Sequence, residues 1–323
     1  MLSRRARSGP VLTSLSLLAM LAAPAGTASA SSSFTLRAGF ITSVSTLPDG
    51  PEGWAYSSGA LLAALEPVGV SSIQWIPFQN GPDLSAAIAG GSVDVGVLGD
   101  TPAVTAKADG IPTRLVDISF VGLDAWLFTP KGGAKTIADL AGKTVATAVG
   151  SYMYRYLVGL LAEHGLAHKV TIASIYPNDA LASLQSGQVA AYAAPAGILT
   201  AKLQSLGYPV LDKASVDNRQ LLGSDVTVIT ASALAAHPTL PSAWDAVVSK
   251  TIVKIQADPS AYDAFAAKVD DVTPAVIQIS EPANDYQVNP FAPSSVKQLQ
   301  GTDNFLLQDG VIKREVDLAA WEA

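Results

Sequence analysis

Short strand patterns alternate with helical patterns from residue 34 onward, and this alternation restricts the chain to few folds. Residues 34–40, 73–78 and 93–98 are apolar strand candidates, and the first alternates with period two. Residues 54–65 and 83–89 lie between them and predict helices. This order is typical of a mostly parallel sheet with helices on its faces, so we predict an α/β fold.

The middle of the chain repeats the scheme. It predicts helices over 137–140, 151–164 and 178–185, and strands over 143–148, 170–175 and 190–194. Residues 83–98 and 179–194 also resemble each other: each begins a helix with an aspartate as N-cap (Asp83, Asp179) and passes through glycine into a Val-led strand. One copy in each half predicts two similarly built lobes.

A mainly helical tail begins near residue 232. Its helices are predicted over 233–236, 241–257, 260–269 and 294–307. A tail that packs back on the first lobe makes that lobe discontinuous. We predict that residues 31–124 and 225–323 form lobe 1, that residues 125–224 form lobe 2, and that a ligand cleft lies between them.

The first thirty residues have the pattern of a signal peptide. Arg4, Arg5 and Arg7 precede an apolar run over 11–23, and Ala28-Ser29-Ala30 matches a cleavage site. The apolar run is short for the alternative, a membrane anchor. We predict a mature periplasmic chain that begins near Ser31, with the Sec and twin-arginine export routes both open. Since the chain has no cysteine, we do not expect a lipoprotein.

Composition and motifs argue against several function classes. The formal net charge of −7 argues against nucleic acid as a partner, and the lack of cysteine removes disulfides and thiolate metal sites. The three histidines lie at predicted helix ends, and no metalloprotease, serine-hydrolase or Walker motif is present. Asp270-Asp271 is interpreted as a turn. We therefore expect no enzyme activity, no catalytic residues, no metal and no cofactor.

Four loops follow predicted strands at the edge where open α/β sheets bind ligands. They cover residues 41–43, 79–82, 99–102 and 150–152. Each places small or hydroxyl residues before a helix, where free backbone N–H groups and the helix dipole suit an anion. Thr101, followed by Pro102 at the first helical position, and Ser151 are candidate N-caps that face each other across the cleft. The alternative is that both hydroxyls only cap their helices.

A series of short motifs follows in a fixed order along the chain: 81–84 (GPDL), 91–96 (GSVDVG), 99–102 (GDTP), 137–146 (IADLAGKTVA), 150–151 (GS) and 187–189 (GQV), with Asp317 and Trp321 near the end. This ordered series resembles the nitrate/sulfonate/taurine group of periplasmic ABC-transporter binding proteins, in particular the aliphatic sulfonate-binding ones. The resemblance implies a two-lobed type II fold that closes on a ligand. It also implies a permease and its ATPase as partners, and a monomer.

The chain departs from the family pattern at two places. Pro195-Ala196-Gly197 stands where members often have W-D-P or W-E-P, and Ile41-Thr42 stands where many have glutamine or an aromatic residue. Both departures indicate a pocket with more space and fewer fixed polar groups. Asp124 and Asp225 border the two lobe crossings, and if they face the cleft they favour an amine or another hydrogen-bond donor on the ligand.

The predicted ligand-binding residues come from these loops and crossings. They are Thr42, Ser43, Gly81, Pro82, Gly99, Asp100, Thr101, Asp124, Trp126, Ser151, Tyr152, Pro195 and Asp225. We expect an ABC-importer binding protein for a small, anionic organic solute of the sulfonate, taurine or nitrate kind. Two alternatives stay open: an enzyme of the same fold that acts on a pyrimidine-like molecule, and a ligand sensor for a membrane receptor.

Overall fold

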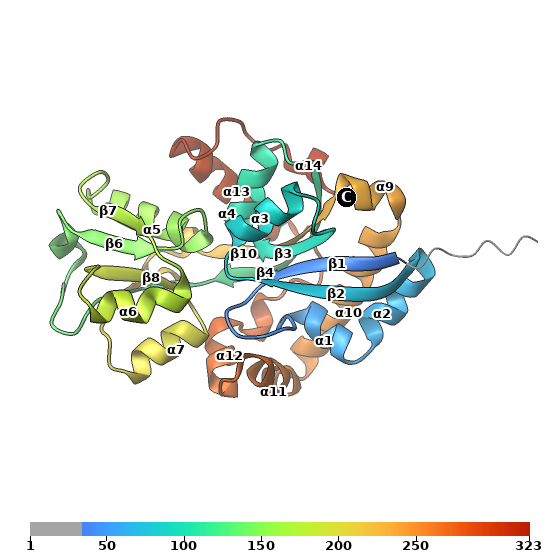
Figure 1. The fold of residues 1–323 in the computed structure, drawn as a ribbon, viewed down its shortest axis with the longest axis horizontal. Helices are drawn as coiled ribbons and strands as arrows, with labels where there is room; N and C mark the ends of the chain where they lie inside the picture. Colours follow the sequence, from blue (N-terminus) through green and yellow to red (C-terminus); the bar gives the residue numbers. More distant parts are fainter. Residues whose placement is uncertain (1–33) are drawn as a thin grey trace, which may run out of the picture. The chain divides into compact units, whose positions relative to one another are not determined.

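A computed structural model describes residues 34–323 as two α/β lobes, each with a five-stranded sheet (Figure 1). The predicted signal peptide lies outside the described residues. The first sheet contains β1 (Phe34–Ile41), β2 (Val70–Phe78), β3 (Val95–Gly99), β4 (Thr113–Leu123) and β10 (Gly223–Thr230). The second contains β5 (Ala125–Phe128), β6 (Thr144–Thr147), β7 (Thr171–Ser174), β8 (Ala191–Pro195) and β9 (Val210–Lys213).

The two sheets have equivalent topologies. Their orders are β2-β1-β3-β10-β4 and β7-β6-β8-β5-β9. In each, the first three strands are parallel, the fourth runs antiparallel to both of its neighbours, and the chain crosses to the other sheet beside that strand. The similar segments 83–98 and 179–194 occupy matching places, since they supply β3 and β8 and the helices before them. The predicted α/β fold with two similarly built lobes is confirmed.

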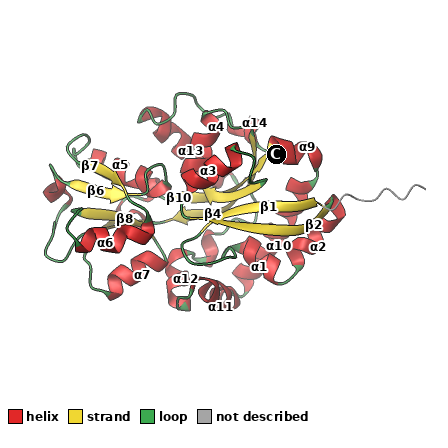
Figure 2. Cartoon of the chain, viewed as in Figure 1, coloured by secondary structure: helices red, strands yellow, loops and turns green. Residues whose placement is uncertain are grey.

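Helices cover both faces of each sheet (Figure 2). The first lobe carries α1 (Pro51–Ser57), α2 (Ala60–Leu65), α3 (Gly81–Ala89), α4 (Asp100–Ala108), α9 (Ala231–Ala236), α10 (Leu240–Ala257), α11 (Pro259–Asp270), α12 (Pro274–Ser280), α13 (Pro293–Gln308) and α14 (Leu318–Trp321). The second carries α5 (Tyr152–Glu163), α6 (Ala180–Gln185), α7 (Ile198–Ser205) and α8 (Ala214–Asp217). Short 3₁₀ helices are η1 (Glu66–Val68), η2 (Ile137–Leu140), η3 (Pro177–Asp179), η4 (Arg219–Leu221) and η5 (Ala283–Asp285).

The apolar core of the first lobe explains why the helical tail returns to it. Trp244 of α10 is fully buried on one face of the first sheet, and Leu299 of α13 is fully buried on the other. Each buried side chain of this size contributes about 1.5–3 kcal/mol through the area it removes from water. None of the described helices combines the length and the apolar character needed to cross a bilayer.

Three predicted details of the helices are wrong. The helix expected over 54–65 is broken into α1 and α2, because Gly59 adopts a left-handed φ of 77° that ends the first helix. The N-cap of α3 is Asn80 and not Asp83: the Asn80 side chain accepts from the Asp83 N–H at 2.9 Å and donates to the Asp83 carboxylate at 2.7 Å. This reciprocal pair satisfies both residues at one helix start.

The third correction concerns α4, which begins at Asp100 with Gly99 as its N-cap, so Thr101 is not the cap. Pro102 therefore lies two residues further inside the helix than predicted. That position costs no hydrogen bond, because the first N–H groups of a helix have no partner within it. The Asp100 carboxylate has other partners, described below, and they hold this residue inside the helix.

Candidate functional site

A cavity of about 220 Å³ lies between the two lobes. Its wall includes the carboxyl ends of all six parallel strands or the segments after them. These are 48–52 after β1, 79–81 after β2 and Gly99 at the end of β3, and then 151–153 after β6, Pro177 after β7 and Pro195 at the end of β8. Open α/β sheets bind ligands at this edge. The cavity is therefore the candidate ligand site.

Six of the predicted ligand-binding residues line this cavity. They are Gly81, Gly99, Ser151, Tyr152, Pro195 and Asp225. In the first sheet Asp225 pairs with Gly99 on one side and with Phe120 on the other, and all three line the cavity. The structure thus brings together residues that are far apart in the sequence.

The other predicted site residues do not line it. They are Thr42, Ser43, Pro82, Asp100, Thr101, Asp124 and Trp126. The Thr42 hydroxyl lies 3.0 Å from the Ser45 hydroxyl and accepts from backbone N–H groups of its own loop, so it organises a turn. Pro82 packs against Gly150 of the other lobe, at the contact between the lobes.

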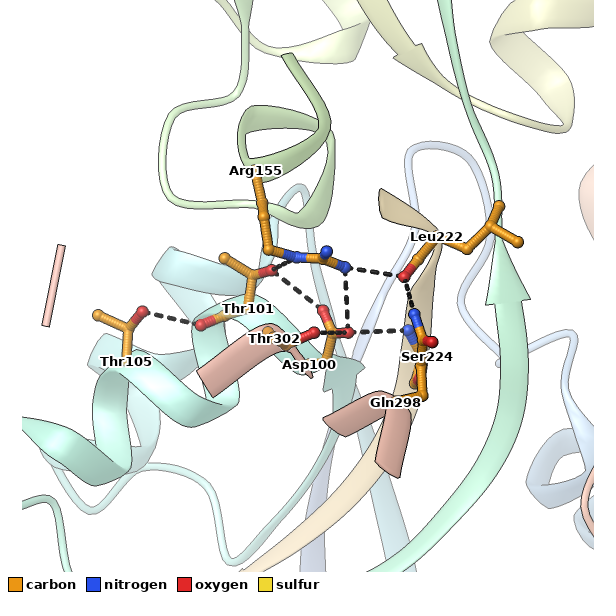
Figure 3. A network of polar contacts seen from close by, with 8 residues as sticks. All are labelled: Asp100, Thr101, Thr105, Arg155, Leu222, Ser224, Gln298 and Thr302. Atoms are coloured by element: carbon orange, nitrogen blue, oxygen red, sulfur yellow. Dashed lines mark hydrogen bonds and ion pairs between the residues drawn. The ribbon is translucent and has the colours of Figure 1, made fainter. Parts of the chain in front are cut away.

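Asp100 and Thr101 belong to a buried polar network that joins the lobes (Figure 3). The Asp100 carboxylate accepts from the Thr302 hydroxyl at 2.8 Å, from the Ser224 N–H at 3.1 Å and from the Arg155 guanidinium at 3.3 Å. Arg155 also donates to the Thr101 hydroxyl at 3.1 Å and to the Leu222 carbonyl at 2.9 Å. These contacts occupy the Asp100 carboxylate, the Thr101 hydroxyl and two of the three guanidinium nitrogens of Arg155.

Arg155 is not among the predicted site residues, although the sequence carries a signal for it. Arg155 is a charged residue among the apolar residues of α5, and a charge in that setting needs a buried partner. Arg155 is 1% exposed, and its partner Asp100 is fully buried. This ion pair links helix α5 of the second lobe to helix α4 of the first.

Asp124 and Trp126 lie in a separate hollow near the lobe crossings. The Asp124 carboxylate accepts from the Trp126 indole N–H at 2.6 Å, and from the Ser215 N–H at 2.9 Å and the Ser215 hydroxyl at 2.6 Å. The Lys213 ammonium lies 3.6 Å from the centre of the Trp126 ring. These contacts fix the crossing between β4 and β5 against β9 and α8. The Asp124 carboxylate, which was predicted to face the ligand, is thus bound by Trp126 and Ser215 instead.

Ser151 is the N-cap of α5, as predicted. Its hydroxyl accepts from the Tyr154 N–H at 3.3 Å and donates to the Ala148 carbonyl at 2.6 Å. Replacing Ser151 by alanine is expected to lower the free energy of unfolding by about 1 kcal/mol, because the helix loses one satisfied N–H. Urea denaturation measures the change.

The control for this substitution is Ser205→Ala, which removes an exposed hydroxyl that donates to the Lys202 carbonyl at the end of α7. Its expected effect is within about 0.5 kcal/mol. Equal effects of the two substitutions would show that the cap at Ser151 contributes no stability of its own.

Four carboxyl groups line the cavity: Asp49, Glu52, Asp225 and Glu281. No lysine, arginine or histidine is present among the described residues of its wall. Gly53 positions two of the four, because a Cβ on it would lie 1.7 Å from the Pro48 carbonyl oxygen, and this close approach folds the 48–53 loop over the cavity. Only Asp225 was predicted from the sequence.

Burial raises the pKa values of Glu52, Asp225 and Glu281. It raises the pKa of Asp225 to about 7, with Asp49, Asp100 and Asp117 adding repulsion. Burial also raises the pKa of Glu52 well above its usual range, and the nearby Asp117 carboxyl increases the effect. The common cause is desolvation, which disfavours the ionised form of each group, and repulsion between neighbouring carboxylates adds to it because no basic side chain of the wall offsets it.

Two of these carboxyl groups differ in their hydrogen bonds. Glu281 accepts from the Tyr262 hydroxyl and, at 2.7 Å, from the Tyr286 hydroxyl, and desolvation raises its pKa well above the usual range. Glu52 is 1% exposed, and its Oε1 atom has no hydrogen-bond partner. A buried acceptor without a partner is uncommon in a folded protein and calls for an explanation.

Neither Glu281 nor Tyr286 carries a local sequence signal, because the tail brings both to the cavity from far along the chain.

Within residues 34–323, no group of three or more histidine, cysteine or acidic side chains is arranged to hold a metal ion.

Sequence comparison relates the chain to a protein family and to several bacterial proteins. A family model described as NMT1/THI5 like matches residues 72–262. A candidate aliphatic sulfonates-binding protein of Escherichia coli (strain K12) is 31% identical over 176 residues, which are 52% of this chain and 51% of that protein. One of the same description from Bacillus subtilis (strain 168) is 26% identical over 262 residues, 79% of this chain and 77% of that protein. The chain thus spans about half the length of the first relative.

A solved structure supports the fold. The alkanesulfonate-binding protein SsuA from Xanthomonas axonopodis pv. citri, bound to MOPS, superposes with a TM-score of 0.72 at 22% identity, covering 90% of this chain and 98% of that one. These comparisons confirm the resemblance that the sequence motifs indicated. The chain belongs to the NMT1/THI5-like family, and it has the two-lobed α/β fold of the periplasmic binding proteins, with its cavity between the lobes.

Proposed function

We propose that this protein is an extracytoplasmic solute-binding protein that captures a small organic solute between its lobes and delivers it to an ABC importer. The observation that carries the proposal is the cavity, whose wall combines segments after the parallel strands of both sheets. A ligand in such a site contacts both lobes at once. Its binding therefore favours the closed arrangement, which is the signal that a permease recognises.

We propose residues 31–124 and 225–323 as lobe 1 and residues 125–224 as lobe 2. The strand assignments support this division with one shift, since β10 of the first sheet already begins at Gly223. A taurine-binding periplasmic protein of Escherichia coli (strain K12), 27% identical over 178 residues, supports a periplasmic location. A permease and its ATPase stay the partners that the family resemblance implies. The descriptions of the two sulfonates-binding relatives support the sulfonate-like solute expected from the sequence. We expect the protein to act as a monomer, because the cavity is complete within one chain.

A binding role without chemistry fits this chain better than catalysis. The sequence has no cysteine, so a cysteine nucleophile is not available to the alternative, an enzyme of the same fold that acts on a pyrimidine-like molecule. In both permease delivery and receptor signalling, the protein releases its ligand without changing it chemically. A solute that is recovered intact after binding therefore supports either role. Co-purification with a permease distinguishes import from sensing.

A thermal-shift screen against amines, sulfonates, carboxylates and pyrimidine-like heterocycles tests the proposal. A ligand at about 100 times its Kd is expected to add roughly 2.7 kcal/mol to stability, which raises Tm by several degrees in a chain of this size. Small-angle X-ray scattering is expected to show a smaller radius of gyration with ligand. Conversion of the solute during binding would contradict the proposal, as would a screen in which no class shifts Tm.

A further inference from the structure

We propose that the cavity selects an organic ammonium ion, whose N–H groups are bound by Glu52, Asp225 and Glu281 and whose apolar part lies against the aromatic wall. This inference rests on the proposed solute-binding function and specifies the charge of the solute. It differs from the sulfonate-like class that the descriptions of the relatives support.

The first observation is the charge of the wall. Four carboxyl groups line the cavity and no basic side chain is present among its described residues, so the site offers acceptors and no cationic donor. The buried guanidinium of Arg155 is already bound by Asp100, Thr101 and the Leu222 carbonyl. Once ionised, this wall would repel a sulfonate, whereas an ammonium ion would stabilise the ionised carboxylates.

The second observation is independent of the first. Glu52 is 1% exposed, lines the cavity and leaves its Oε1 atom without a partner. Leaving a buried polar acceptor without a partner is costly, and a ligand N–H would remove that cost. A quaternary ammonium has no N–H to give. The unpaired oxygen therefore favours a primary or secondary amine.

The rest of the wall suits the carbon part of such a ligand. Phe40, Phe120, Tyr152 and Tyr286 all line the cavity. The rings of Phe120 and Tyr286 meet edge to face with centroids 4.9 Å apart, and the Tyr286 hydroxyl donates to Glu281. Aromatic faces beside carboxylates attract an ammonium through the ring quadrupole and cover a hydrocarbon body.

A protonated carboxyl offers a competing arrangement, because it can donate a hydrogen bond to a sulfonate. The two arrangements differ in their response to pH. Ammonium binding needs ionised carboxylates, so affinity rises with pH through about 7, the pKa of Asp225. Sulfonate binding needs protonated ones, so affinity falls over the same range. The other titratable or charged groups that act on this wall are Asp49, Asp100, Asp117, Tyr152, Arg155, Tyr262, Asp270 and Tyr286.

The test is isothermal titration of the mature chain with matched pairs of probes: propylamine against propanesulfonate, hexylamine against hexanesulfonate, and benzylamine against phenylmethanesulfonate. Within at least one pair we expect the amine to bind and the sulfonate not to bind, with an affinity that rises with pH. Glu52→Gln keeps the shape of the side chain and is expected to weaken amine binding about ten- to a hundredfold.

Glu163→Gln is the matched control, since it makes the same change at an exposed position of α5 outside the cavity. It is expected to leave affinity unchanged. Tighter binding of the sulfonate in every pair, or an amine affinity equal in the wild type and Glu52→Gln, would overturn the inference and leave the solute-binding function intact. A failure of all probes, together with no thermal shift from any solute class, would overturn both.

Discussion

Replacement of Arg155 by methionine is expected to lower the free energy of unfolding by about 3–5 kcal/mol. Arg155 is 1% exposed and donates to the Asp100 carboxylate, the Thr101 hydroxyl and the Leu222 carbonyl. Methionine fills much of the same volume but leaves the fully buried Asp100 carboxylate without its counter-ion. Urea denaturation followed by circular dichroism measures the loss.

Two further variants isolate the buried charge as the cause. Arg155→Met combined with Asp100→Asn removes both charges and is expected to recover a large part of the stability. Arg37→Met breaks an ion pair with Asp94 in which the arginine side chain is 39% exposed, and it is expected to cost roughly 1 kcal/mol or less. A loss at Arg155 no larger than that at Arg37 would show that the network does not hold the lobes together.

The fold could be predicted because its signals are local and repeated. Period-two and helical patterns recur in an order that allows few topologies. The similarity between segments 83–98 and 179–194 indicates a second lobe built like the first. The details that failed depend on contacts with distant residues. Thr101 has the sequence context of a cap, but Asp100 is bound by Thr302, Ser224 and Arg155, and these partners set the start of the helix.

The site residues that could be predicted are those at the ends of strands. Gly81, Gly99 and Ser151 line the cavity because each lies at or shortly after the end of a parallel strand, and the sequence pattern shows where those strands end. Asp124 and Asp225 look equivalent in the sequence, since each borders a crossing. Their roles differ because Asp225 lies within β10 on the cavity side, whereas Asp124 lies between β4 and β5 and binds Trp126 and Ser215.

Without ligand, the protein is expected to become less stable as pH rises from about 4 to about 8. Burial raises the pKa of Asp225 and that of Asp117 from 3.8 to about 7. Between these values both carboxyl groups are protonated in the folded chain and ionised in the unfolded chain, so each rise in pH favours unfolding. A pKa unit corresponds to about 1.4 kcal/mol, so Asp225 alone accounts for up to about 4 kcal/mol.

Urea denaturation at a series of pH values measures this slope. Asp225→Asn removes one titrating group, so it is expected to flatten the slope and to be more stable than the wild type near pH 8. Asp258→Asn is the contrast, because its N-cap hydrogen bonds lower the pKa of Asp258, and its contribution is present above the unfolded pKa and lost as pH falls. Wild-type stability that rises steadily from pH 4 to 8 would contradict the prediction.

The same slope reports the charge of the solute. An ammonium ligand stabilises the ionised carboxylates and moves their pKa values back toward the unfolded ones, so saturating benzylamine is expected to flatten the decline in stability. A sulfonate ligand favours the protonated forms and is expected to steepen it. A cavity that weakens the empty fold at neutral pH is stabilised by the solute that neutralises it. Carboxyl groups that are unfavourable for folding alone therefore serve binding.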